Sequence, residues 1–121
     1  MNAYTKALEY DKEFLMGRLN RATTWIRVRA FDNCIADCND IENQILALKE
    51  SEREDEFYGR LLARLYVKRG ASYAWISNFE KALEDYERAI KNKLVFSEQE
   101  LNEMERDMRR IERRKNSFAL K

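Results

Sequence analysis

Apolar side chains recur three or four residues apart along most of the chain, which is the spacing of an amphipathic helix. No segment alternates between apolar and polar residues in steps of two, so we expect helices and no strand. Three stripes show the pattern most clearly: Leu62, Leu65, Tyr66, Tyr73 and Ile76; Phe79, Leu83, Tyr86 and Ile90; and Leu101, Met104, Met108 and Ile111.

Local signals divide this pattern into separate helices. Ser77 and Asn78 form a turn-like pair between two stripes, and a second turn is predicted around residues 29–32. Ser97 is followed three residues later by Glu100, which is a capping box and predicts the start of a last helix. The predicted helices are 2–11, 13–29, 32–48, 52–76, 79–94 and 97–116.

A sequence repeat relates the two halves of the chain. The segment FDNCIADC at 31–38 aligns with FEKALEDY at 79–86. A weaker similarity, at a shorter spacing, indicates that part of another unit precedes these two segments. The extra residues of the longer spacing fall around 49–56, which holds no apolar side chain, so we expect an exposed helix extension with a short break near 49–51. Arg21, Ala22, Trp25, Phe31, Ile35 and Asp37 are matched by Arg69, Gly70, Tyr73, Phe79, Leu83 and Asp85.

Composition excludes several classes of protein. The 121 residues are 45% hydrophobic, which suits one folded domain. The 23 basic and 22 acidic residues nearly cancel, whereas nucleic-acid modules are usually basic, so we expect no nucleic-acid partner. No apolar run approaches the ~18–20 residues of a membrane span, and the start lacks a signal-peptide core, so we predict a cytoplasmic protein without a membrane partner. There is no histidine and no phosphate-binding glycine loop, so we predict no enzyme and no cofactor.

Cys34 and Cys38 lie four residues apart and would share one face of a helix. The favoured interpretation is two small core side chains. A metal site would need further ligands, and a disulfide across one helical turn has poor geometry. Two free thiols are typical of a reducing compartment.

The repeated unit resembles the tetratricopeptide repeat, a pair of helices joined by a tight turn. Gly70 or Ala22 would let the two helices of a unit approach closely. The resemblance implies an all-α fold, a right-handed superhelix of antiparallel helix pairs that ends in a C-terminal capping helix. It rests on Gly70, Tyr73, Phe79, Ala82, Tyr86 and Ala89 in one unit and on Ala22, Trp25, Phe31, Cys34, Cys38 and Ile41 in the other.

The resemblance also divides residues 1–121 within a single repeat domain. Residues 1–12 would be the second helix of a truncated first repeat, and residues 13–48 the second repeat. Residues 49–94 would be a third repeat with an extended first helix, and residues 95–121 the capping helix. Because the chain would begin inside a repeat, we expect it to be a fragment or a short isoform.

Three polar residues resemble the carboxylate clamp of tetratricopeptide co-chaperones. In that clamp, one Asn and two basic residues on neighbouring first helices hold the C-terminal Asp of heat-shock protein 90 or 70. Asn20 matches the Asn, and Arg64 and Lys68 match the basic residues. Arg64 and Lys68 are four residues apart, on one helix face, and charge-assisted hydrogen bonds to carboxylates are strong. The clamp's remaining Lys and Asn would lie on a helix upstream of this chain.

A narrower resemblance links residues 2–5, 19–22 and 63–70 to dynein axonemal assembly factors of the dyslexia-candidate type. It implies a role with chaperones in preassembling dynein arms in the cytoplasm, with other assembly factors as partners. The alternative is a scaffold that binds a partner helix or protein in its groove without a clamp.

Three further features each have two interpretations. Trp75 either lines the groove and contacts a peptide or packs between units. Tyr4 and Leu8 lie on an apolar face that would lack its partner helix, and this face either frays or forms a homodimer. A basic stretch on the last helix is either a solvated face or a site for RNA or an acidic partner. That stretch comprises Arg106, Arg109, Arg110, Arg113, Arg114 and Lys115, and is partly neutralised by Glu105, Asp107 and Glu112.

Overall fold

The computed structural model describes the backbone of residues 2–119 and the side chains of residues 12–117. No strand occurs between residues 2 and 119, so the predicted all-helical fold is confirmed. The elements are α1 (Asn2–Arg27), α2 (Phe31–Leu46), α3 (Glu50–Arg53), α4 (Glu56–Trp75), α5 (Phe79–Ile90), the 3₁₀ helix η1 (Lys93–Val95) and α6 (Glu98–Ala119).

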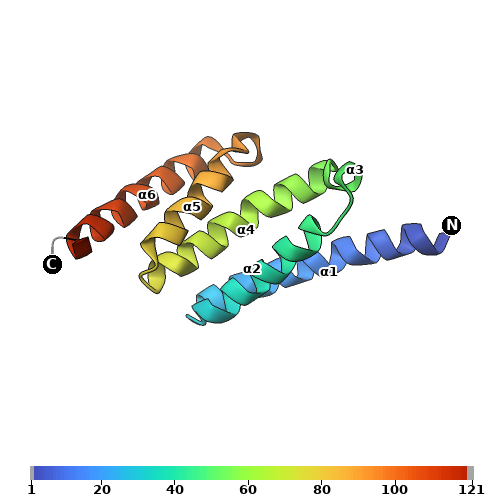
Figure 1. Cartoon of the computed structure of the whole chain (residues 1–121), viewed down its shortest axis with the longest axis horizontal. Coiled ribbons are helices and arrows are strands. Elements are labelled where there is room, and N and C mark those ends of the chain that lie inside the picture. The colour runs from blue at the N-terminus through green and yellow to red at the C-terminus, as the bar shows by residue number, and fades with distance from the viewer. Residues whose placement is uncertain (1, 120–121) are drawn as a thin grey trace.

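The long helices form a row of antiparallel neighbours, with the N-terminus and the C-terminus at opposite ends (Figure 1). Helix α1 packs on α2, α2 on α4, α4 on α5, and α5 on α6, so each long helix packs against the next long helix in the chain. Helix α1 also touches α4 directly, which places the first helices of the two pairs side by side. The N-terminal end of α1 projects beyond the rest of the array (Figure 1).

The two tight turns have the same backbone geometry, as the sequence repeat predicts. Arg29 ends the first turn with φ 62°, and Ser77, at the matching position of the second unit, has φ 65°. In both turns the following N–H donates to the carbonyl oxygen five residues earlier, at 2.8 Å. This is the Schellman pattern, which satisfies carbonyl groups left free at a helix end. Both turns were placed correctly from the sequence.

The predicted break between helices 2–11 and 13–29 is wrong, because α1 runs without interruption from Asn2 to Arg27. No glycine or proline stands between residues 9 and 14, so nothing in the backbone interrupts the helical hydrogen bonds there. The apolar pattern of residues 2–11 therefore continues one helix. The proposed division into repeats remains a prediction.

The helix predicted over residues 52–76 is also shorter than expected. Helix α4 starts at Glu56 because Asp55 caps it, accepting a hydrogen bond from the Phe57 N–H at 2.9 Å. The Asp55 carboxylate is also 2.7 Å from the Lys12 ammonium of α1, which fixes this corner. The predicted extension is therefore reduced to the single turn of α3.

The remaining helix ends agree more closely with expectation. Helix α5 ends at Ile90 rather than at residue 94, and η1 connects it to α6. The capping box is formed as predicted: Ser97 N–H donates to Glu100 Oε1 and Glu100 N–H donates to Ser97 Oγ, both at 3.1 Å.

Two apolar clusters stabilise the array, one on each side of α4. The first joins α1, α2 and α4 around Leu19, Ile41 and Leu65, and the second joins α4, α5 and α6. Tyr66 of α4 packs against both clusters, which links them. Gly70 lies where α4 meets α5: an added Cβ would be 3.2 Å from the Ala82 carbonyl oxygen, so only glycine fits without a shift. This confirms the close approach predicted at Gly70.

Candidate functional site

The predicted clamp residues lie on the first helices of the two pairs, Asn20 on α1 and both Arg64 and Lys68 on α4. Asn20 of α1 and Lys68 of α4 occupy equivalent places when the two units are aligned. Asn20 is exposed. Arg27 lies two turns beyond Asn20 on the same face of α1, and its charge acts on Lys68.

Lys68 is half-buried and forms no ion pair with any described side chain. Burial lowers the pKa of Lys68, and the positive charges of Arg64 and Arg27 lower it further. Three cations thus gather at the junction of α1 and α4. A buried positive charge without a counter-ion is unfavourable, so this position is suited to an anion.

Arg64 is half-exposed and already has a weak acidic partner. Its guanidinium is 3.7 Å from the carboxylate of Glu100, and it lies over the Phe96 ring at 5.9 Å. Glu100 belongs to the capping box of α6, so the start of α6 places a carboxylate beside the predicted clamp. An exposed ion pair of this kind contributes only about 0–1 kcal/mol, so a ligand carboxylate can replace it.

Trp75 has features of both interpretations proposed for it. Its ring stacks on Phe31 of α2 with centroids 5.5 Å apart, and the Arg29 guanidinium lies 5.4 Å from its centroid. The side chain is nevertheless 58% exposed. Trp75 therefore packs between the two pairs and still exposes more than half of its surface to solvent.

Trp75 also borders a pocket of about 270 Å³ between α4, α5 and α6. Its wall includes Phe79 and Ile111, and its rim includes Arg110 and Arg114 of α6. Two of the six residues of the basic stretch therefore lie at a pocket, which the sequence pattern alone did not indicate.

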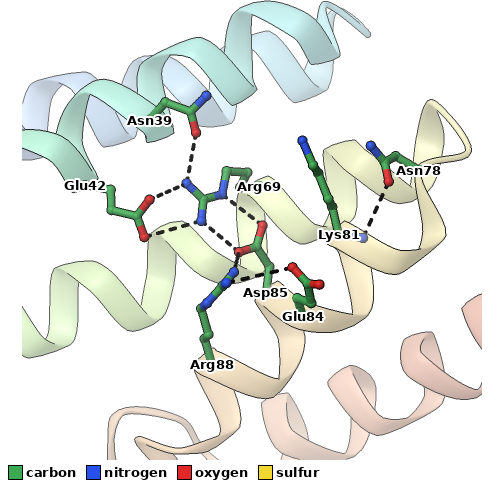
Figure 2. A network of polar contacts seen from close by, with 8 residues as sticks. All are labelled: Asn39, Glu42, Arg69, Asn78, Lys81, Glu84, Asp85 and Arg88. Carbon is green, nitrogen blue, oxygen red and sulfur yellow. Dashed lines mark hydrogen bonds and ion pairs between the residues drawn. The ribbon is translucent and has the colours of Figure 1, made fainter.

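A buried polar network is the part of this region that sequence reasoning missed (Figure 2). Arg69 of α4 donates to both carboxylate oxygens of Asp85, at 2.9 and 2.8 Å. It also donates to Asn39 and Glu42 of α2, at 2.9 and 2.8 Å. Arg69 is next to Lys68 in sequence, so the network fixes the helix that carries the two predicted clamp residues Arg64 and Lys68.

The repeat carried a signal for this network. Arg21 and Asp37 form an ion pair in the first unit, and Arg69 and Asp85 form one at the same separation in the second. Both pairs belong to the residues matched by the sequence repeat. An Arg and an Asp that recur together at matching positions indicate a contact between the two helices of a unit.

The two cysteines are buried and free, as the core interpretation predicts. The Cys34 thiol donates a weak hydrogen bond to the Lys68 carbonyl oxygen, with Sγ and O 3.9 Å apart, so it contacts the backbone at a predicted clamp residue. The Cys38 side chain lowers the pKa of the Cys34 thiol to about 7, despite the opposing effect of burial.

Sequence comparison links this geometry to known proteins. The chain is 29% identical over 116 residues to Hsp70-Hsp90 organizing protein 1 of Glycine max, an alignment that covers 90% of this chain and 19% of that protein. It is 30% identical over 93 residues to the Hsp70-Hsp90 organizing protein of Triticum aestivum, covering 72% of this chain and 14% of that protein. The chain thus spans less than a fifth of the length of these relatives. No family model and no solved structure matches it.

The likeness and the helix pairs together bear out the tetratricopeptide-repeat array and support a co-chaperone domain. The narrower resemblance to dynein assembly factors stays a prediction, since none of the matched relatives is named for that process. Within residues 2–119, no helix combines the length and hydrophobicity required to cross a membrane.

Proposed function

We propose that this array binds the acidic C-terminal tail of heat-shock protein 90 or 70 in the groove between α1 and α4. Arg64 and Lys68 bind the carboxylates, and Asn20 donates a hydrogen bond to the terminal one. The observation that carries the proposal is the half-buried ammonium of Lys68, which has cations beside it and no acidic partner among the described side chains. The matched relatives, named for organizing Hsp70 and Hsp90, support the choice of ligand.

The chemistry of such a tail suits this group of side chains. A chain that ends in Asp presents a side-chain carboxylate and a main-chain carboxylate close together. Arg and Lys donate charge-assisted hydrogen bonds to carboxylates, which are roughly twice as strong as neutral ones. Asn20 adds a neutral donor that repels neither carboxylate. A bound anion would also offset the mutual repulsion of Lys68, Arg64 and Arg27.

Titration calorimetry with a peptide ending in Glu-Glu-Val-Asp tests the proposal. Arg64→Ala and Lys68→Ala should each weaken binding by about 1.5–3 kcal/mol, the range for hydrogen bonds to charged groups. Lys91→Ala removes one positive charge at the end of α5 and serves as the matched control, which should leave binding unchanged. Affinity should fall as salt rises, because partly exposed charges are screened over ~8–10 Å.

Glu100 offers a second test in the opposite direction. Glu100→Gln removes the competing carboxylate but keeps a side chain that can complete the capping box. Peptide affinity should rise roughly twofold to fivefold, as expected for loss of one exposed ion pair. An unchanged affinity would mean that Glu100 does not compete with the ligand for Arg64.

Amidation of the peptide's C-terminus separates the clamp from the scaffold alternative. The clamp requires that amidation remove most of the affinity, because the terminal charge is lost. If amidated and free-acid peptides bind equally well, the array is a scaffold whose groove ignores the terminal carboxylate.

A further inference from the structure

The pocket at the α6 side of α4 is distinct from the clamp positions. It opens between the C-terminal turns of α4 and the middle of α6, and its volume of about 270 Å³ is below the ~300–1,000 Å³ of drug-sized ligand sites. Ala71, Ala74, Phe79 and Ile111 give it an apolar lining. A space of this size and character suits one bulky apolar side chain.

The rim of the pocket carries the residue types that dominate protein interfaces. Trp75 is 58% exposed there, and Arg110 and Arg114 lie one turn apart on α6. Neither arginine forms an ion pair with a described side chain, whereas Lys115 beside them reaches Glu80 of α5 at 4.0 Å. Trp and Arg are enriched among residues whose truncation weakens binding most.

One acidic group also lies in the pocket wall. Asp107 accepts a hydrogen bond from the Tyr86 hydroxyl at 3.3 Å, so its carboxylate is turned towards α5. Burial raises the pKa of Tyr86, and the charge of Asp107 raises it further, so the hydroxyl keeps its proton and the hydrogen bond. Arg110 and Arg114 outweigh this single charge, and the rim stays net positive.

We propose that this pocket binds an internal acidic peptide segment that carries one bulky apolar side chain. The apolar side chain enters the space between Phe79 and Ile111 and is covered by the edge of Trp75. Acidic side chains on either side of it pair with Arg110 and Arg114. The site needs no free C-terminus, so it is independent of the clamp and would let the array hold two acidic segments.

Charge and shape favour a peptide over a nucleic acid. Binding along a phosphate backbone draws its affinity from many Lys and Arg contacts to phosphates, and only two guanidinium groups border this pocket. Asp107 in the wall would repel a continuous row of phosphates. An apolar space with two cations on its rim instead suits a short peptide segment in which an apolar side chain lies between acidic ones.

The probe is the peptide acetyl-Glu-Glu-Leu-Glu-Glu-amide, followed by the indole N–H signals of the intact protein in ¹⁵N NMR. The chain has two tryptophans, and they give an internal reference. Trp25 donates its indole N–H to Asp37 at 2.9 Å, away from this pocket. We expect a saturable shift of the Trp75 signal and none of the Trp25 signal. A peptide with Ala in place of Leu, and one with Lys in place of Glu, should produce little shift.

Two double variants with the same change in charge locate the site. Arg110→Gln with Arg114→Gln should weaken binding about tenfold, as expected for loss of two ion pairs made by exposed arginines. Arg109→Gln with Arg113→Gln changes exposed residues of α6 outside the pocket and should bind as the wild type does. Equal melting temperatures of the two double variants would exclude an effect through folding.

Several results would overturn the proposal. They are a Trp75 signal that does not move, an equal loss in both double variants, and equal binding of the Ala peptide. Loss of binding in Arg64→Ala alone would place the probe in the groove between α1 and α4 and remove this proposal, whereas the proposed function is decided separately by the comparison of free-acid and amidated peptides. Tighter binding of an oligouridylate through Arg110 and Arg114 would make the pocket a nucleic-acid site instead.

Discussion

The same arginine–aspartate pair occurs in both repeat units, in two different environments. In the first unit Arg21 contacts Asp37 and its side chain stays 53% exposed. In the second unit Arg69 contacts Asp85 and its side chain is only 7% exposed. Arg69 holds Glu42 and Asn39 of α2 as well, and Arg88 adds a second cation to Asp85 at 3.0 Å.

The difference comes from position in the array rather than from the repeated sequence. Arg69 lies where α2 covers α4, so residues of one unit complete the hydrogen bonds of the next. Arg21 bonds within its own unit, where Trp25 also donates to Asp37. Arg21 therefore links the two helices of its own unit. Arg69, at the junction, also links its unit to α2 of the preceding unit.

The largest expected effect is that of removing each arginine in turn. Arg69→Met leaves the carboxylates of Asp85 and Glu42 buried without their main partner, which costs about 3–5 kcal/mol. Arg21→Met also leaves a buried carboxylate, that of Asp37, but Arg21 is half-exposed and Asp37 keeps the Trp25 indole donor, so the cost should be smaller, about 1–3 kcal/mol. Urea denaturation of the two variants measures both values. Equal losses would show that burial of the second arginine is not what distinguishes the units.

A second contrast uses the glycines. Gly70→Leu should destabilise the protein by about 1–3 kcal/mol, because the side chain would be forced against the Ala82 carbonyl and Tyr86. Gly17→Ala should instead stabilise it by about 0.5–1 kcal/mol, since α1 has open space there and alanine favours a helix. Thermal melting measures both effects, as a lower melting temperature for Gly70→Leu and a higher one for Gly17→Ala. A Gly70→Leu variant with an unchanged melting temperature would mean that α4 and α5 are less closely packed than described.

Acid should weaken both the ion pair of Asp37 with Arg21 and the ion pair of Glu42 with Arg69. Arg21 lowers the pKa of Asp37 through its hydrogen bond, although burial opposes it. Burial raises the pKa of Glu42, but the hydrogen bond and charge of Arg69 outweigh it, so the net shift is downward. A carboxyl group whose pKa is lowered in the folded state stabilises the fold at pH values above its ordinary pKa of roughly 4. This stabilisation is lost as the pH falls through the pKa that the group has in the folded state.

The free energy of unfolding should therefore fall below about pH 4. The fall should be less steep in Arg69→Met, in which Glu42 has lost the partner that lowers its pKa. Urea denaturation between about pH 2 and pH 7 measures the slope for both proteins. Identical slopes would show that the Arg69 pairing does not govern acid stability.

The smallest effect concerns the exposed side of the first unit. A homodimer through the predicted apolar face of Tyr4 and Leu8, whose side chains lie outside those described, would cover α1 as α2 covers α4. Tyr4→Asp with Leu8→Asp should then give a monomer, with little change in the rest of the array. Light scattering decides this: a wild-type chain that is already a monomer at high concentration removes the dimer.

The site was predictable only in part. The spacing of Arg64 and Lys68 placed both on one helix, and the repeat placed Asn20 at the position equivalent to Lys68 on the neighbouring first helix. The pairing of Glu100 with Arg64 was not predictable, because the two residues are far apart in sequence and meet only through the packing of α6. Nor did any local pattern single out Arg110 and Arg114, among six basic residues, as the pair that borders a pocket.

The sequence by itself determined the helices, the two turns and the repeat, because these depend on local spacing and on hydrogen bonds within a few residues. It also determined the capping box at Ser97 and the need for glycine at position 70. Only the tertiary structure decided that α1 is continuous and that Asp55, held by Lys12, starts α4. The tertiary structure alone decided that Arg69 is buried while Arg21 is half-exposed. The burial of a residue depends on which helix packs over it, and the similar local sequences around the two arginines do not specify that helix.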